Sequence, residues 1–296
     1  MPGGFVNPYI QSILLGIVEG LTEFLPVSST AHLRISEALM KISLDDPYWK
    51  MYTVVIQLGA ILALCLLYLG RIVDFMRTFP NGESGERNFF NHPLTLTFVA
   101  FCFTAGPAFL LHKWSEKNLG SLTVMAVALL VGGVVMWVID AWASRHDAET
   151  LDVEQMSLPQ AIWIGICQTL SAVFPGTSRS MSTIAAAQLV NMDRPAALEF
   201  SFLLSIPTMI AATGWDLLKE LHPSKAALAS GLVTHVQMTG ERWGVLLVGM
   251  AVSFVVAFGV VEWFLMWVRK HGFTVFAIYR ILLGIALLIW GSKYVL

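Results

Sequence analysis

Long apolar segments are the feature of this sequence that most constrains its fold. Six segments contain few charged side chains and are about 20 residues long, which is the length of an α-helix that crosses a bilayer. Only 13% of the residues are charged, against about a quarter in a soluble domain. The sequence therefore predicts an all-α, polytopic membrane bundle, with residues 1–296 in a single membrane domain. The six expected spans are 51–69, 93–111, 121–141, 195–218, 243–268 and 273–293.

Two further apolar stretches are too short to cross the bilayer. Residues 9–25 and 159–174 are each followed by a proline, Pro26 or Pro175, then by a turn rich in Ser and Thr and by a second helix-like segment. Proline cannot continue a helix, and hydroxyl groups inside a membrane need polar partners. We therefore predict two re-entrant helical hairpins in addition to the six full transmembrane helices.

The two hairpins resemble each other in sequence. Residues 11–30 align without a gap on residues 160–179, and the same offset carries the first three spans onto the last three. Each half then has one hairpin and three crossings, and an odd number of crossings reverses the direction of the second half. The sequence predicts an inverted-topology repeat, approximately 8–145 and 157–296, whose hairpins enter from opposite faces and meet near the bilayer midplane.

The charge distribution limits the partners but leaves the orientation open. The net charge is −2, so no basic surface for nucleic acid is expected. The 18 Lys and Arg residues divide equally between the two sides when Arg280 is counted with the loops of one side, so the positive-inside rule does not decide the orientation. The Arg269–Lys270 loop weakly favours a cytoplasmic position for its own side. Cys65, Cys102 and Cys167 lie singly in apolar segments and are expected to be packing residues.

The first hairpin carries two carboxylates in an apolar helix. Glu19 and Glu23 are four residues apart, so they share a helix face. Ionisable groups inside a membrane are energetically costly and usually serve a function. Two facing carboxylates suit either a hard divalent cation or an acid–base pair. Packing against an arginine is the structural alternative.

Hydroxyl groups and a histidine follow the Pro26 break. Ser28, Ser29, Thr30 and His32 lie within one turn of the next expected helix. Ser29 and His32 are three residues apart and can share a face, as a nucleophile and its base require. Helix N-capping explains the hydroxyl groups equally well.

The second hairpin has the composition of an anion site. Gly176 allows a tight turn, and Thr177, Ser178 and Ser180 supply hydroxyl groups at the N-terminus of the following helix, where unpaired N–H groups and the helix dipole favour anions. Arg179 adds a planar guanidinium that matches phosphate oxygens in pairs. An ion pair between this arginine and one of the two glutamates is the alternative.

These motifs resemble those of a known family. The sequence EGLTEFLPVSSTAHL at 19–33, together with PGTSRS at 175–180, is similar to the undecaprenyl-diphosphate phosphatases, the bacitracin-resistance membrane phosphatases of bacteria. The similarity continues through VVIQLGAILA at 54–63 and FSFLLSIP at 200–207, with Ala31 where many relatives would have glycine. The resemblance implies removal of the terminal phosphate of undecaprenyl diphosphate in the bacterial cytoplasmic membrane, a site open to its outer face, and stimulation by a divalent cation.

Carried over by position, the resemblance assigns roles to residues of both motifs. The family's glutamates correspond to Glu19 and Glu23, its serine and histidine to Ser29 and His32, and the second motif's pair to Ser178 and Arg179. We expect Mg²⁺ or Ca²⁺ on one or both glutamates. Attack by Ser29, activated by His32 or by a glutamate, and direct attack by water both remain open. A lipid transporter or flippase is the alternative function, and a homodimer is one possible assembly.

Overall fold

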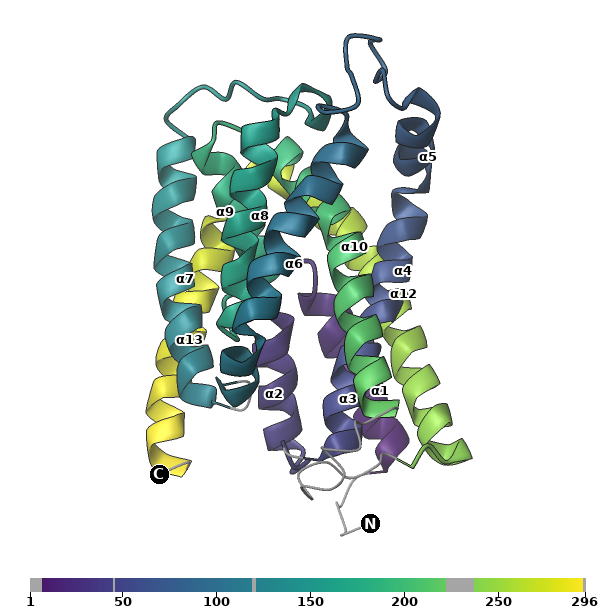
Figure 1. Ribbon diagram of the computed structural model, residues 1–296. Helices are drawn as coiled ribbons and strands as arrows, with labels where there is room; N and C mark the ends of the chain where they lie inside the picture. Colours follow the sequence, from purple (N-terminus) through teal and green to yellow (C-terminus); the bar gives the residue numbers. More distant parts are fainter. Residues whose placement is uncertain (1–6, 45, 119–120, 222–236, 295–296) are drawn as a thin grey trace.

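A computed structural model describes residues 7–44, 46–118, 121–221 and 237–294, and these residues are almost entirely helical (Figure 1). Within them there is no β-strand, only one isolated bridge between Thr150 and Met192. Five helical segments of this described part are long and apolar enough to cross a membrane. They are Pro47–Leu67, Pro93–Leu111, Leu122–Ala143, Arg194–Trp215 and Gly240–His271. The predicted all-α membrane fold is confirmed.

The first and last predicted spans differ in detail from the structure. The first consists of two short helices, α3 (Pro47–Val55) and α4 (Gln57–Leu67). The sequence did not predict the helix that follows them, α5 (Leu69–Thr78). The last predicted span corresponds to α13 (Thr274–Tyr294), whose apolar part ends at Trp290 and which is not among the five candidates.

Two helix–turn–helix units occupy the positions of the predicted hairpins. In the first unit α1 (Pro8–Thr22) is followed by α2 (Ser29–Leu39), and in the second α8 (Leu158–Val173) is followed by α9 (Arg179–Leu189). Figure 1 shows the first unit beginning at the lower end of the bundle and the second beginning at the upper end. The proline-containing turns therefore lie inside the bundle.

Four long helices surround these units: α6 (Pro93–Asn118), α7 (Leu122–Ala143), α10 (Arg194–Leu221) and α12 (Gly240–His271). Helix α1 packs along α12, α8 packs along α6, and α7 packs along α13. This arrangement encloses both turns.

Glycines allow the two equivalent helix contacts to be close. A Cβ atom at Gly16 in α1 would collide with the carbonyl oxygen of Gly249 in α12. A Cβ atom at Gly165 in α8 would collide in the same way with the carbonyl oxygen of Ala100 in α6. Small residues let helix backbones approach closely in membranes. The sequence alignment pairs Gly16 with Gly165.

The alignment shifts by one residue after the prolines. The N-cap residues of α2 and α9 are Ser28 and Ser178, whereas the ungapped alignment pairs Ser178 with Ser29. The second turn has one more residue between its proline and its N-cap, and an alignment without gaps cannot represent that insertion. Ser29 and Arg179 are therefore the equivalent first residues of their helices.

Candidate active site

The tips of the two helix–turn–helix units are in direct contact. The Ser180 hydroxyl, in the first turn of α9, donates to the carbonyl oxygen of Leu25 at 3.0 Å and lies 3.2 Å from the Ser178 hydroxyl. Ser180 is 1% exposed. Polar groups from both halves of the chain thus meet in a buried region, as the sequence predicted for the tips.

Both N-cap serines hold a backbone conformation that is unusual for residues other than glycine. The φ angles are 74° at Ser28 and 71° at Ser178, in the left-handed region, which costs roughly 1–3 kcal/mol and is common at functional sites. Each hydroxyl accepts a backbone N–H, from Ala31 at 3.4 Å and from Met181 at 3.3 Å. N-capping is therefore a role that the structure shows for these two serines.

Gly176 is required by the second turn for two reasons. Its φ angle is +96°, and a Cβ atom there would lie 2.7 Å from the carbonyl oxygen of Met125 in α7. Only glycine tolerates both this conformation and this close approach. The turn is consequently held tightly against α7.

Glu23 lies at the centre of the cluster. The Ser29 hydroxyl donates to its Oε2 atom at 2.5 Å, and the Arg179 Nη2 group donates to its Oε1 atom at 3.3 Å. Ser29 and Glu23 are each 8% exposed. The first residues of α2 and α9 therefore converge on one carboxylate, which is in position to accept the serine proton.

Arg179 retains donor capacity after these contacts. Its Nη1 group donates to the carbonyl oxygen of Ser201 in α10 at 3.3 Å. Its Nε group is buried and has no hydrogen-bond partner among the described residues. The ion pair with Glu23 thus exists, and it leaves a donor for an incoming anion.

Glu19 lies one turn before Glu23 and is 0% exposed. Neither of its carboxylate oxygens has a hydrogen-bond partner in the described part of the chain. No group of three or more His, Cys, Asp or Glu side chains that could hold a metal occurs among those residues. Glu19 therefore fits a hard cation only where the ligand supplies further oxygens.

The ring of His32 has hydrogen-bond partners other than Ser29 in this structure. Its Nδ1 atom lies 2.7 Å from the carbonyl oxygen of Ser28, and its Nε2 atom lies 2.6 Å from the hydroxyl of Tyr279 in α13. Both ring nitrogens are engaged. Of the other candidates, Thr177 contributes its carbonyl oxygen to the contacts of Arg280, and Thr30 is half-buried beside the Ser29 position.

Arg280, also in α13, joins both turns. It is 0% exposed. Its Nη1 group donates to the carbonyl oxygen of Pro26 at 3.1 Å, and its Nη2 group contacts the carbonyl oxygens of Gly176 and Thr177 at 3.2 and 2.9 Å. A further contact reaches the carbonyl oxygen of Ala128. One side chain thereby fixes the distance between the two tips.

The sequence reasoning missed Arg280 and Tyr279. Counting Arg280 with the loop charges was wrong, because it lies inside α13 and is fully buried. The signal was present, since an arginine within an apolar segment usually has a function. For Tyr279 no comparable signal exists, because a tyrosine in an apolar helix has many uses.

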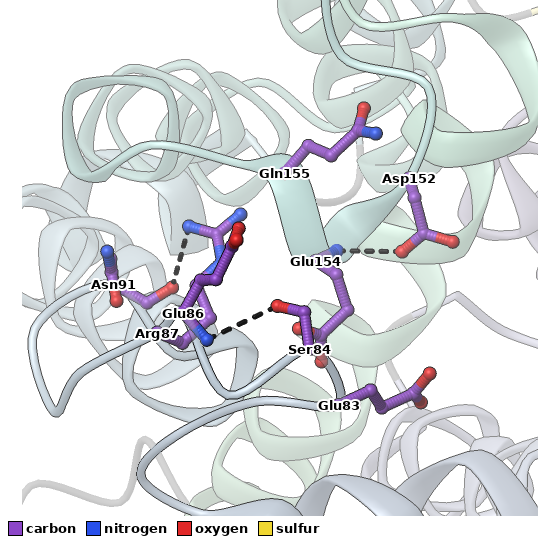
Figure 2. A pocket seen from close by; sticks show the side chains of 8 residues that line it. All are labelled: Glu83, Ser84, Glu86, Arg87, Asn91, Asp152, Glu154 and Gln155. Atoms are coloured by element: carbon purple, nitrogen blue, oxygen red, sulfur yellow. Dashed lines mark hydrogen bonds between the residues drawn. The ribbon is translucent and has the colours of Figure 1, made fainter.

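A separate cleft of about 440 Å³ lies outside this cluster (Figure 2). It is formed by residues of the segments between α5 and α6 and between α7 and α8, among them Glu83, Arg87 and Asp152. Burial raises the pKa of Glu154 there. None of the candidate site residues lines this cleft, so it is not the site described above.

The fold and the cluster together define a class: polytopic membrane proteins with a buried polar site between two helical hairpins. The sequence model of the family described as bacitracin resistance protein BacA matches residues 12–286. The chain belongs to this family, and the resemblance stated from its motifs is confirmed.

Three relatives of this chain share one name. The undecaprenyl-diphosphatase of Koribacter versatilis is 57% identical over 97% of this chain and 100% of its own length. The enzyme of the same name from Caldanaerobacter subterraneus is 39% identical over 94% of each chain. That of Rhizobium etli is 40% identical over 95% of this chain and 96% of its own.

Proposed function

We propose that this protein is an undecaprenyl-diphosphate phosphatase, which removes the terminal phosphate of undecaprenyl diphosphate and leaves the monophosphate carrier lipid for cell-wall synthesis. The observation that supports this most directly is the convergence of Ser29 and Arg179 on Glu23. A hydroxyl, its proton acceptor and a phosphate-binding cation are the groups that phosphoryl transfer requires. The family membership and the name shared by the relatives agree with it.

In the proposed reaction Ser29 attacks the terminal phosphorus and Glu23 accepts the serine proton. The 2.5 Å contact between these side chains favours Glu23 over His32 for this step. Arg179 binds the phosphoryl oxygens through the donor that has no partner in the structure. The helix N-termini at Ser28 and Ser178 provide further N–H groups for the anion. Direct attack by water is the alternative, and failure to trap a phosphoseryl enzyme in quenched turnover mixtures would favour it.

We also propose that a divalent cation takes part in the reaction. Glu19 would hold Mg²⁺ or Ca²⁺ through its two unpartnered oxygens, with Glu23 as a second ligand. When bound, such a cation neutralises the charge of the diphosphate. The remaining ligands would be substrate oxygens, because the described residues offer no third carboxylate nearby.

A transporter for a phosphate-bearing lipid is the competing function. Its usual architecture also has inverted repeats with interrupted helices at the centre. Release of phosphate from a long-chain isoprenyl diphosphate by the purified protein in detergent decides between the two. A phosphatase must turn the substrate over, whereas a transporter without hydrolytic activity releases no phosphate.

We further propose that α13 is a sixth span, that both helix–turn–helix units are re-entrant, and that the halves form an inverted repeat. The location would be the bacterial inner membrane, with the site opening to its outer face. The opposite directions of the two units in Figure 1 support the inverted arrangement. The structure describes one chain, so a homodimer stays a prediction.

Labelling of single cysteines tests this topology. In a variant that lacks Cys65, Cys102 and Cys167, Ser84→Cys and Glu241→Cys are expected to react with an impermeant thiol reagent from opposite sides of the membrane. Both positions are exposed, and an odd number of crossings separates them in the proposed arrangement. Reaction of both from one side would contradict the inverted repeat.

Substitution of Arg179 tests whether geometry or charge matters at this position. Lysine keeps the charge but cannot present paired N–H donors in one plane. We expect Arg179→Lys to lower turnover about tenfold, because a misplaced donor stabilises the transferring phosphoryl group less. The measurement is phosphate release by variants that elute as monodisperse species in detergent. Activity within about threefold of wild type would reduce the role of Arg179 to charge balance.

A further inference from the structure

The geometry of His32 separates it from the serine and directs it toward α13. A carbonyl oxygen only accepts hydrogen bonds, so the contact with Ser28 requires Nδ1 of His32 to carry the hydrogen. In the neutral ring Nε2 then has a free electron pair, and the Tyr279 hydroxyl donates to it at 2.6 Å. The two rings also stack, with centroids 5.6 Å apart and planes at 12°. The tautomer and the ring orientation are both fixed.

Glu23 already contacts the hydroxyl of Ser29, so His32 is not needed for the serine proton. After the serine has attacked, Glu23 is protonated and can no longer act as a base. A phosphoserine intermediate must still be hydrolysed, and the attacking water needs a proton acceptor. Among the groups described at the tips, Nε2 of His32 is a neutral nitrogen whose electron pair already accepts the Tyr279 hydroxyl and can take up its proton.

We propose that Tyr279 and His32 together accept the proton of the water that hydrolyses phosphoserine 29, with Tyr279 as a relay. This inference rests on the proposed phosphatase function and on its serine route. It adds a residue of α13 to the reaction and assigns the two proton acceptors to different steps. Glu23 serves the attack by Ser29, and the Tyr279–His32 pair serves the attack by water.

In this step the water oxygen bonds to phosphorus, and the bond between phosphorus and the Ser29 oxygen breaks. The water proton passes to the Tyr279 oxygen as the phenol proton passes to Nε2 of His32. Glu23 returns its proton to the Ser29 oxygen, and inorganic phosphate leaves. The histidine finally loses its extra proton to solvent.

Tyrosine is suited to this relay because a hydroxyl both donates and accepts. Tyr279 can therefore donate to neutral His32 and accept from the charged ring without a change of ring position. The stacking of the two rings holds both groups in this arrangement.

Rapid-quench kinetics with a long-chain isoprenyl diphosphate test the proposal. Tyr279→Phe keeps the stacked ring and removes only the hydroxyl. We expect it to release one equivalent of lipid monophosphate in a rapid burst, then to release phosphate about tenfold more slowly than wild type, because one proton-transfer contribution is lost. Acid-quenched samples should contain phosphoserine at position 29. His32→Gln should behave in the same way.

Tyr9→Phe is the matched control, because Tyr9 is also partly exposed and lies at the start of α1, away from both tips. It should retain wild-type kinetics. Normal turnover of Tyr279→Phe, or slowed turnover without phosphoserine, would overturn the relay. Absence of phosphate release from the wild-type protein would instead refute the phosphatase function itself, so the two failures can be distinguished.

Discussion

Replacing Glu23 with glutamine is expected to lower phosphate release by at least about a hundredfold, the scale of a lost general acid–base group. Glutamine keeps the shape of the side chain, and its amide cannot accept the Ser29 proton. It also removes the negative charge that Arg179 contacts at 3.3 Å. Unlike Tyr279→Phe, this variant should show no burst of lipid monophosphate, because the attack by Ser29 is the step that fails.

A second glutamate–arginine pair provides the control for this substitution. Glu199 in α10 accepts from the Nε group of Arg71 at 2.9 Å, and the other hydrogen bonds of Arg71 reach Glu83 and Asp152, outside the cluster at the tips. Glu199→Gln should keep turnover within about threefold of wild type, well inside one factor-of-ten step of barrier height. If Glu23→Gln were equally active, the carboxylate would be a packing group and another base would have to be found.

The parts of the fold that follow local rules could be predicted from the sequence. Long apolar segments predicted five of the spans. Pro26 and Pro175, each followed by a turn rich in Ser and Thr, predicted the positions of both turns, although proline alone does not decide this, since Pro107 and Pro207 lie inside α6 and α10. The hydroxyl groups and Arg179 were found because their spacing after each proline places them at a helix N-terminus. A contact of Ser29 with a glutamate and an ion pair of Arg179 with a glutamate were each named as alternatives. The ungapped alignment hid that the two residues are the equivalent first residues of α2 and α9.

The remaining contacts depend on tertiary packing. Arg280 and Pro26 are separated by 254 residues, and no periodic pattern links two such positions. His32 was paired with Ser29 because a spacing of three places both residues on one helix face. In the structure the carbonyl oxygen of Ser28 and the hydroxyl of Tyr279 hold the ring elsewhere. Spacing limits which side chains can meet, and competing partners decide which of them do.

Arg280→Lys is expected to lower turnover by about a hundredfold, because a displacement of about 1 Å at reacting groups has an effect of this size. The guanidinium donates to the Pro26 carbonyl oxygen from one nitrogen and to those of Gly176 and Thr177 from another. A lysine ammonium is a single point on a flexible stem and cannot span these positions. The two tips would then lose their common support, and Ser29 would no longer face a phosphate held by Arg179.

The expected loss distinguishes geometry from charge, since lysine retains the positive charge inside the bundle. Buried carbonyl oxygens left without a donor should each cost about 1–3 kcal/mol, so the thermal unfolding midpoint in detergent should fall as well. Arg194→Lys is the control, because Arg194 donates to Asp140 at 2.8 Å at the end of α7 that is away from the tips. Both variants should remain monodisperse. If Arg280→Lys and Arg194→Lys both kept wild-type turnover, a positive charge at position 280 would suffice. The tips would then be held together by Ser180 and Arg179 alone.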